Sequence, residues 1–485
     1  MSNKRLITHS KYIAVSVLII LVFRFILLGA IPLLDKTEAR YGEIARLMYE
    51  TKEWVMLQIG YGIPFWAKPP LSTWLSAISF TVFGVNEIAA RLPFYLLNVI
   101  ILIILGYWVK KLKISFLLPA FILLTMPEFL IHTGVVSTDV ALSFSITLIM
   151  ISFWKAIQKE EHSIWDYLFF IAVGLGFLSK GPIVLVLTGP PIFIWLILQK
   201  IKIKAVYSRL PWVKGTIITC LISIPWYVLA EKRSPGFLNY FIVGEHFDRF
   251  LKPHWNGDLY GSGHPQPIGM IWVFLLLFTF PWFQIVLIKL WKNRATLLKD
   301  NWVSFLVLWL FWIPIFFTMS KNILHTYILP VTIPIALLMV HWWAPYKNKK
   351  TALILSSIFP IGAIIVFIGL NFMEAWHEQL NSDKYLIEHQ IPKPSGVSTP
   401  IYYWKNVSYS GEFYSKGHAK KIPTKKALET IINTNKKFYF IVLKKRIKDI
   451  PKTFINQLVF LESNYTTSIF LYEMPIDNLQ TNQPI

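Results

Sequence analysis

Cysteine is almost absent from this sequence of 485 residues, and acidic side chains are scarce. The single cysteine, Cys220, lies in an apolar run and cannot form a disulfide within the chain, so its expected role is packing. Only 26 acidic residues oppose 48 basic ones, which gives a formal net charge of +22. Because the basic residues lie largely between apolar runs, we attribute the excess to membrane topology and anionic lipid, and we expect no nucleic-acid binding.

The sequence also lacks a glycine-rich phosphate loop, zinc-ligand spacing and internal repeats. Apolar residues are abundant instead: 55% of the chain is hydrophobic, 16% is aromatic, and the mean hydropathy is +0.51. These values exceed those of a soluble domain. A helix needs roughly 20 apolar residues to cross a bilayer, and such runs recur to about residue 370. The expected fold class is therefore an all-α polytopic membrane protein.

Apolar length predicts about 11–13 transmembrane helices. The individual spans are expected at residues 12–33, 88–109, 114–131, 136–154, 165–178, 182–199, 211–230, 267–290, 302–318, 323–342 and 351–370. The first run is too long for a signal-peptide core, and no small-residue cleavage site follows it. We therefore expect it to be retained as the first span.

Lys and Arg gather in alternate short loops, those that follow residues 109, 199, 288 and 346. By the positive-inside rule these loops and the N-terminus are cytoplasmic, and the alternate segments, including the loop 34–87, lie outside. After residue 371 the apolar runs stop, and β-prone stretches appear at 438–443 and 468–472. The sequence thus predicts a membrane domain at 1–370 and a small α/β domain at 371–485.

Charged residues crowd the first outer loop. Residues 35–48 carry apolar side chains at helical spacing, which predicts an amphipathic interfacial helix whose acids either solvate its polar face or act chemically. Further along, Lys68 stands between an aromatic pair and two prolines that restrict the local backbone. Such an ammonium group either anchors the loop among lipid headgroups or binds a lipid-linked phosphate.

Two further charged residues lie at the outer ends of apolar runs. A carboxylate at the position of Asp139 is costly unless it is paired or hydrated, although Asp is also a preferred helix N-cap, and both interpretations stay open. Lys180 lies in a tight turn between spans. A structural turn with an outward lysine is the favoured interpretation there.

The longer outer loop, residues 231–267, combines carboxylates with imidazoles, among them His246. These groups could bind a divalent cation, but no spacing is diagnostic and a hydrated loop is favoured. Arg249 is the stronger candidate, because a guanidinium binds two phosphate oxygens at once, as lysine cannot. A last group is expected at an outer helix end: Lys321, His325 and Tyr327.

Six segments together carry a resemblance: Thr-Glu-Ala-Arg-Tyr (37–41), Phe-Trp-Ala-Lys-Pro-Pro (65–70), Asn-Glu-Ile-Ala-Ala-Arg-Leu-Pro (86–93), Ser-Thr-Asp (137–139), Gly-Phe-Leu-Ser-Lys-Gly-Pro (176–182) and Glu-His-Phe-Asp-Arg-Phe (245–250). In order and spacing they resemble the bacterial dolichyl-phosphate-mannose-protein mannosyltransferase-like family, closest to the aminoarabinose transferases of lipid A. The resemblance covers roughly residues 12–345.

The resemblance implies a GT-C fold in the bacterial inner membrane, with a periplasmic active site and C-terminal domain. By position it implies three groups of site residues: catalytic candidates Asp35, Glu38 and Asp139; donor-phosphate ligands Arg40, Tyr41, Lys68, Arg249 and Tyr327; and further cavity residues Lys180, His246, Lys321 and His325. Two positions depart from the family pattern. Many lipid A members have an acid at the position of Thr37, and some have a glutamate at the position of Ala67. Alanine at position 67 cannot serve as a metal ligand. We therefore assign no cofactor, and a bound divalent metal ion stays an open alternative.

The expected activity is inverting transfer of a sugar from a polyprenyl (undecaprenyl) phosphate to lipid A phosphate or another cell-envelope acceptor. Charge grows on the leaving phosphate, and Lys68 and Arg249 are expected to stabilise it. The alternatives are a protein O-mannosyltransferase and a transporter or flippase of lipid-linked sugars. A transporter would need charged groups along its pathway, whereas these spans are nearly free of midplane acids.

Overall fold

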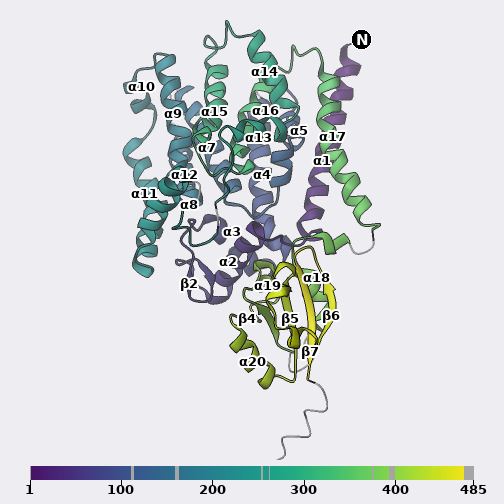
Figure 1. Ribbon diagram of the computed structural model, residues 1–485. Coiled ribbons are helices and arrows are strands. Elements are labelled where there is room, and N and C mark those ends of the chain that lie inside the picture. The colour runs from purple at the N-terminus through teal and green to yellow at the C-terminus, as the bar shows by residue number, and fades with distance from the viewer. Residues whose placement is uncertain are drawn as a thin grey trace, which may run out of the picture. The chain divides into compact units, whose positions relative to one another are not determined.

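The computed structural model describes residues 2–110, 114–158, 163–252, 255–261, 263–373, 376–392 and 399–474, without the side chains of 2–9 and 203. The chain divides into two compact units (Figure 1). The first comprises Met1–Ala30 and Leu47–Ile365, and the second comprises Ile31–Arg46 and Val366–Ile485. The short segment before residue 47 therefore groups with the C-terminal residues, although the sequence places it in the membrane part.

The helices of the first unit are those of a multi-pass membrane protein. By length and composition, six helices of the described residues could cross a bilayer: α1 (Ser2–Ala30), α4 (Glu87–Lys110), α7 (Thr138–Gln158), α11 (Trp212–Arg233), α15 (Asn301–Thr318) and α17 (Lys349–Leu370). A bent pair, α13 (Met270–Phe278) and α14 (Trp282–Lys292), makes up to seven. The chain bends by 104° between the two helices, where Pro281 interrupts the backbone hydrogen bonds.

The remaining predicted spans correspond to shorter or broken helices. These are α5 (Leu118–Leu124) with α6 (Pro127–His132), α8 (Ile164–Lys180), α9 (Ile183–Leu198), and η2 (His325–Val331) with α16 (Thr332–His341). Proline separates α5 from α6, because Pro127 supplies no backbone N–H and is favoured in the first turn of a new helix. Local sequence also starts α8: the Ser163 backbone N–H donates to the Asp166 carboxylate (2.7 Å) in a capping box.

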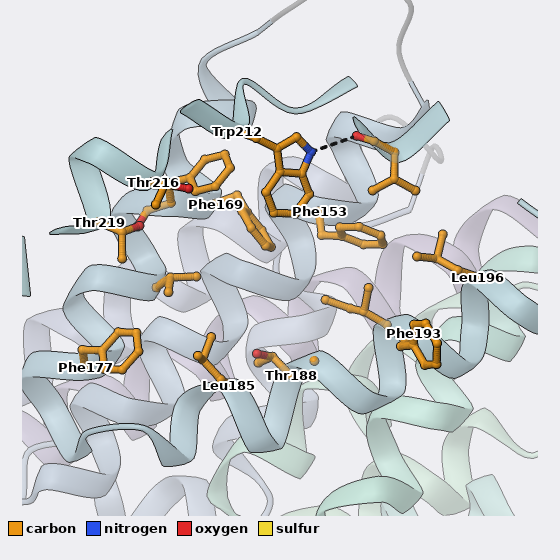
Figure 2. A pocket seen from close by; sticks show the side chains of 15 residues that line it. Phe153, Phe169, Phe177, Leu185, Thr188, Phe193, Leu196, Trp212, Thr216 and Thr219 are labelled. Carbon is orange, nitrogen blue, oxygen red and sulfur yellow. Dashed lines mark hydrogen bonds between the residues drawn. The ribbon is translucent and has the colours of Figure 1, made fainter. Parts of the chain in front are cut away.

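Helix α7 lies at the centre of the first unit and is buried along most of its length. Two of its hydroxyl groups are satisfied within the helix, since Ser145 and Thr147 donate to the carbonyl oxygens of Ala141 (2.9 Å) and Ser143 (2.7 Å). Beside α7 lies an apolar pocket of about 410 Å³, lined by residues of α7–α11, where α10 is Ile203–Arg209 (Figure 2). Phenylalanine, leucine and threonine side chains point into it, and the Trp212 indole lies at one side.

The segments between the helices include a small hairpin and a π-helix. Strands β1 (Gln58–Gly60) and β2 (Ile63–Pro64) are antiparallel and follow α2 (Thr37–Thr51), which is the helix expected in the first outer loop. Helix α3 (Leu71–Phe83) comes next. The π-helix η1 (Asn239–Asp248) runs directly into α12 (Arg249–Leu251).

The second unit contains a five-stranded mixed sheet in the order β4-β3-β5-β7-β6. The strands are β3 (Ile401–Trp404), β4 (Ala419–Ile422), β5 (Lys437–Leu443), β6 (Leu458–Ser463) and β7 (Thr467–Glu473). Strand β3 is parallel to β4 and β5, whereas β7 is antiparallel to β5 and β6. The helices are η3 (Trp376–Gln379), α18 (Lys384–Gln390), α19 (Tyr409–Tyr414), α20 (Lys425–Thr434), η4 (Lys444–Asp449) and α21 (Lys452–Ile455). The two predicted β-prone stretches are confirmed as β5 and β7.

Candidate active site

Two basic residues that lie far apart in the sequence converge on one buried carboxylate in the first unit. Lys68 Nζ lies 2.7 Å from Glu245 Oε2, and Arg249 Nη1 lies 2.8 Å from Glu245 Oε1. The Glu245 side chain is only 4% exposed, while those of Lys68 and Arg249 are 17% and 26% exposed. The carboxylate thus holds both cations with their outer surfaces still accessible to an anion.

The charges of this cluster are coupled. Burial opposes ionisation of Glu245, but Lys68 and Arg249 more than offset it and hold the pKa of this carboxyl below its usual range. A second acid, Asp258, lies 3.6 Å from Arg249. Ala67 offers no ligand atom, and Glu245 is engaged by two cations, so these described residues do not fit a metal ion beside Lys68.

The β1–β2 hairpin and the aromatic residues beside it position Lys68. The Trp66 indole donates to Ser234 (2.8 Å), and its backbone N–H donates to the Tyr260 hydroxyl (3.0 Å). That hydroxyl donates to the carbonyl oxygen of Pro64 (2.9 Å). After Lys68, Pro69 and Pro70 lead directly into α3. The lysine therefore lies in a segment held on both sides, as its sequence context predicted.

The Arg249 turn is held by a residue that the sequence did not indicate. The Asn322 side-chain amide donates to the carbonyl oxygens of Arg249 (2.6 Å) and Lys252 (3.0 Å). The neighbouring backbone N–H of Lys321 donates to Phe250 (3.1 Å). The predicted group at residues 321–327 thus lies against the segment that carries Arg249.

Asp139 and Lys180 form a second buried ion pair. Lys180 Nζ donates to the Asp139 carboxylate, and it lies 4.4 Å from the centre of the Tyr327 ring. Asp139 occupies the first turn of α7, which begins at Thr138, so it is not the N-cap. The expectation of an outward Lys180 is wrong: its side chain is only 16% exposed, because the end of α8 directs it toward α7. Paired in this way, the carboxylate avoids the cost of isolated burial.

His246 links the two ion-pair clusters. Its Nε2 lies 3.2 Å from the carbonyl oxygen of Lys180, and its Nδ1 lies 2.7 Å from that of Phe241. Burial lowers the pKa of His246, which favours the neutral ring. The predicted residues 68, 139, 180, 246, 249 and 327 therefore belong to one connected region.

We expect the substitution Gly181→Ala to disturb this region. Gly181 has a φ of +80°, and a Cβ atom there would lie 2.7 Å from the Phe241 ring and 3.1 Å from His246 Nε2. The variant should lose more than about 1 kcal/mol of stability, because both the backbone and the packing resist it. Thermal unfolding of detergent-solubilised protein measures the loss. Gly189→Ala is the control, since nothing lies within 4 Å of its Cβ position; equal melting temperatures would contradict the prediction.

His325 lies in a different set of contacts. Its Nδ1 is 2.9 Å from Glu128 Oε2, and His132 Nδ1 is 3.0 Å from Glu128 Oε1. The sequence did not single out Glu128 or His132, whose only signal is the spacing of four residues on α6. The structure thus places His325 with a glutamate and a histidine, two residues before Tyr327.

Part of the chain is similar to a known protein family. Residues 12–241 match the model of a family described as dolichyl-phosphate-mannose-protein mannosyltransferase. The match covers slightly less than half of the chain. The resemblance inferred from the six motifs is confirmed.

The chain is also similar in sequence to bacterial arabinosyl transferases. The undecaprenyl phosphate-alpha-4-amino-4-deoxy-L-arabinose arabinosyl transferase of Yersinia pestis is 29% identical over 380 residues, 73% of this chain and 66% of the relative. The protein of the same name from Wigglesworthia glossinidia brevipalpis is 30% identical over 388 residues, 75% of this chain and 65% of the relative. The chain thus spans slightly less than two thirds of the length of these relatives.

The fold is similar to that of a solved ArnT structure. The crystal structure of ArnT from Cupriavidus metallidurans bound to undecaprenyl phosphate has a TM-score of 0.72 and 16% identity. The match covers 95% of this chain and 98% of that one. The predicted helical multi-pass fold with a small sheet-containing C-terminal region is confirmed.

Four predicted site residues belong to the second unit: Asp35, Glu38, Arg40 and Tyr41. The Asp35 carboxylate accepts hydrogen bonds from the Ser410 hydroxyl and backbone N–H. Glu38 lies in the first turn of α2, and the Arg40 guanidinium lies 5.4 Å from the centre of the Tyr41 ring. Their catalytic and phosphate-binding roles stay predictions.

We expect Asp35→Asn to stabilise the second unit at neutral pH. Burial, and next the nearby Asp383, raise the pKa of Asp35 from 3.8 to about 7. The folded state therefore binds more protons than the unfolded one between about pH 4 and pH 7, so stability falls as pH rises through this window. The asparagine variant should flatten that fall, as measured by thermal unfolding at several pH values.

Glu412 provides the comparison for this prediction. Its pKa is also raised to about 7, by burial and next by Glu43, so part of the pH dependence should persist in Asp35→Asn. A variant with the unchanged pH profile of the parent protein would contradict the buried-acid assignment. A stable variant that has lost sugar transfer would favour a catalytic Asp35.

Proposed function

We propose that this protein is an integral-membrane glycosyltransferase that moves a sugar from undecaprenyl phosphate to a phosphate of lipid A. Its relatives' names make 4-amino-4-deoxy-L-arabinose the first candidate for the sugar. The observation that carries the proposal is the convergence of Lys68 and Arg249 on Glu245, because two partly exposed cations on one buried carboxylate form a site for a phosphate.

The proposed reaction is a single displacement. An oxygen of the acceptor phosphate attacks the anomeric carbon of the sugar and forms a new C–O bond. The bond between that carbon and the donor's phosphate oxygen breaks, its electron pair stays on the oxygen, and undecaprenyl phosphate leaves. The configuration at the anomeric carbon inverts. An anionic acceptor needs no general base, whereas a hydroxyl acceptor would require a carboxylate such as Asp139 or Asp35.

Each residue of the cluster has a distinct part in this proposal. Lys68 and Arg249 bind the donor phosphate and stabilise the negative charge that grows on it as the bond breaks. Glu245 is a positioning residue, because it orients both cations without contacting the sugar. Asp139, held by Lys180 beside Tyr327, is proposed to line the cavity for the sugar and the acceptor.

The apolar pocket beside α8 suits the hydrocarbon part of a lipid substrate. Only Phe177 and Leu185 of its lining approach the end of α8 that carries Lys180, whereas Leu196, Val206 and Trp212 lie toward the predicted cytoplasmic ends of the helices. Its volume of about 410 Å³ accommodates several isoprene units of a polyprenyl chain rather than a whole one. The sequence-derived topology further places the site on the periplasmic side, with residues 1–370 as the catalytic membrane domain and 371–485 as an appended domain.

Mass spectrometry of lipid A from cells with and without the protein tests the proposal. We expect a mass increase of one sugar residue that depends on the protein and disappears in the Lys68→Ala, Arg249→Ala double variant. Unchanged lipid A together with protein-dependent glycosylation of cell-envelope proteins would replace it with the second candidate, an O-mannosyltransferase, which the description of the matched family favours. Unchanged lipid A and unchanged proteins would overturn both.

A further inference from the structure

We propose that Glu128, His132 and His325 form a binding site for a divalent transition-metal ion of the Zn²⁺ type. Each of the three side chains offers one ligand atom, and these atoms all lie within 4.8 Å of one another. The site is separate from the Lys68–Glu245–Arg249 cluster, and it connects α6 to the start of η2, 197 residues away in sequence.

The chain places these ligands by simple helix geometry. Glu128 and His132 are four residues apart on α6, so their side chains project from the same face of the helix. His325 begins η2, and the Phe278 ring stacks on its imidazole with centroids 4.9 Å apart and planes inclined by 11°. All three side chains are therefore directed by elements of regular structure.

The donor set fits a borderline metal ion. Two imidazoles and one carboxylate are the ligands of catalytic and related zinc sites, whereas Mg²⁺ and Ca²⁺ prefer oxygen ligands alone. In a tetrahedral zinc site, ligand atoms lie roughly 3.4 Å apart, given metal–ligand distances of about 2.1 Å. His325 Nδ1 lies 2.9 Å from Glu128 Oε2, close to that value, and the candidate ligand atoms of all three residues lie within 4.8 Å of one another.

The second observation is an unsatisfied buried oxygen. The Glu128 side chain is 0% exposed, and its Oε1 has no hydrogen-bond donor among the described residues, although His132 Nδ1 lies 3.0 Å away. His132 Nδ1 instead faces the backbone oxygen of Glu128 at 2.9 Å. A histidine that donates from one nitrogen to a carbonyl oxygen keeps the other nitrogen available for a metal, as ligating histidines usually do. A cation would satisfy the carboxylate oxygen that the imidazole leaves unpaired.

The three ligand side chains differ in their exposure to solvent. Glu128 and the largely buried His132 form the inner side, whereas the His325 side chain is 35% exposed and leaves a route for the ion. Three protein ligands leave a fourth position for water. His132 also experiences the charge of Asp139, so the bound ion would lie close to the Asp139–Lys180 pair.

The test uses the full-length protein in detergent, purified through a tag without histidine. Elemental analysis after incubation with Zn²⁺ and removal of excess metal should give one zinc per chain, and Co²⁺ in its place should give the visible absorption of a tetrahedral site. His325→Asn should weaken Zn²⁺ binding by more than roughly 100-fold, the upper range for loss of an outer-shell partner. Because His325 is partly exposed, the His325→Asn variant should keep the fold. Glu128→Gln is a second variant for the same measurement.

Two controls decide where any metal binds. His341→Ala removes a histidine that lies 3.3 Å from Asp300 and belongs to no three-ligand group among the described residues, and it should keep the full zinc content. His389→Ala disrupts a second cluster, His377, His389 and Glu462, in the other unit, and it should also keep it. Zinc at background level in the parent protein, zinc retained in His325→Asn, or zinc lost in His389→Ala would each overturn the proposal.

Discussion

Replacing Arg249 by alanine is expected to lower the rate of sugar transfer by about 10²–10³-fold, the range found when one preorganised charge-stabilising donor is lost. The alanine substitution removes the contact of Arg249 with Glu245. It also removes the guanidinium N–H donors that would bind the leaving phosphate. If these donors act mainly on the charge of the transition state, kcat falls much more than the affinity for the donor substrate. Transfer from radiolabelled undecaprenyl-phosphate sugar to purified lipid A measures both quantities.

Two further variants make this prediction specific. Arg249→Lys should restore only part of the rate, because lysine cannot bind two phosphate oxygens in one plane. Lys252→Ala is the matched control: Lys252 forms a similar pair with Asp248 on the same segment, but its side chain is 61% exposed. Transfer at the parental rate by Arg249→Ala, or an equal loss in Lys252→Ala, would disprove the phosphate-binding assignment.

Replacing Asp139 by alanine is expected to lower the free energy of unfolding by about 3–5 kcal/mol, the usual cost of leaving one member of a buried ion pair without its partner. The Lys180 ammonium would lose its carboxylate partner, although it would still lie beside the Tyr327 ring. Unfolding in increasing SDS, followed by tryptophan fluorescence, measures this loss.

A double variant separates stability from chemistry at the same site. Asp139→Leu with Lys180→Met replaces the pair by apolar side chains of similar size, so it should regain most of the stability that Asp139→Ala loses. If Asp139 lines the catalytic cavity, sugar transfer stays low in this stable double variant. Recovery of both stability and transfer would show that the pair only holds α7 and α8 together.

The membrane fold was predictable because its main determinant is local. Burying backbone groups in a bilayer forces helices, and the apolar length that each helix needs is visible in the sequence. The β-prone stretches of the second unit were visible for the same reason, as short runs of aromatic and aliphatic residues. The breaks at Pro127 and Pro281 were harder to predict, since a proline in an apolar run is compatible with a kinked span as well as with two helices.

The candidate site was predictable only in part. The two prolines after Lys68 and the phosphate-binding chemistry of arginine identified both cations without reference to their neighbours. Glu245 lay in the same motif as Arg249, yet nothing in its local sequence indicated that it holds a lysine 177 residues away. The Lys180 side chain was wrongly predicted to point outward for the same reason, because its partner Asp139 lies on another helix.

The sequence by itself determined the helical multi-pass fold, the family resemblance and the residue types suited to a phosphate, since these depend on local composition and on the order of motifs. Only the tertiary structure decided which charges are paired. An ion pair depends on the distance between atoms and on their burial, and both arise when helices far apart in sequence pack together. Thus Lys68 and Arg249 share Glu245, Asp139 holds Lys180, and Glu128 gathers two histidines.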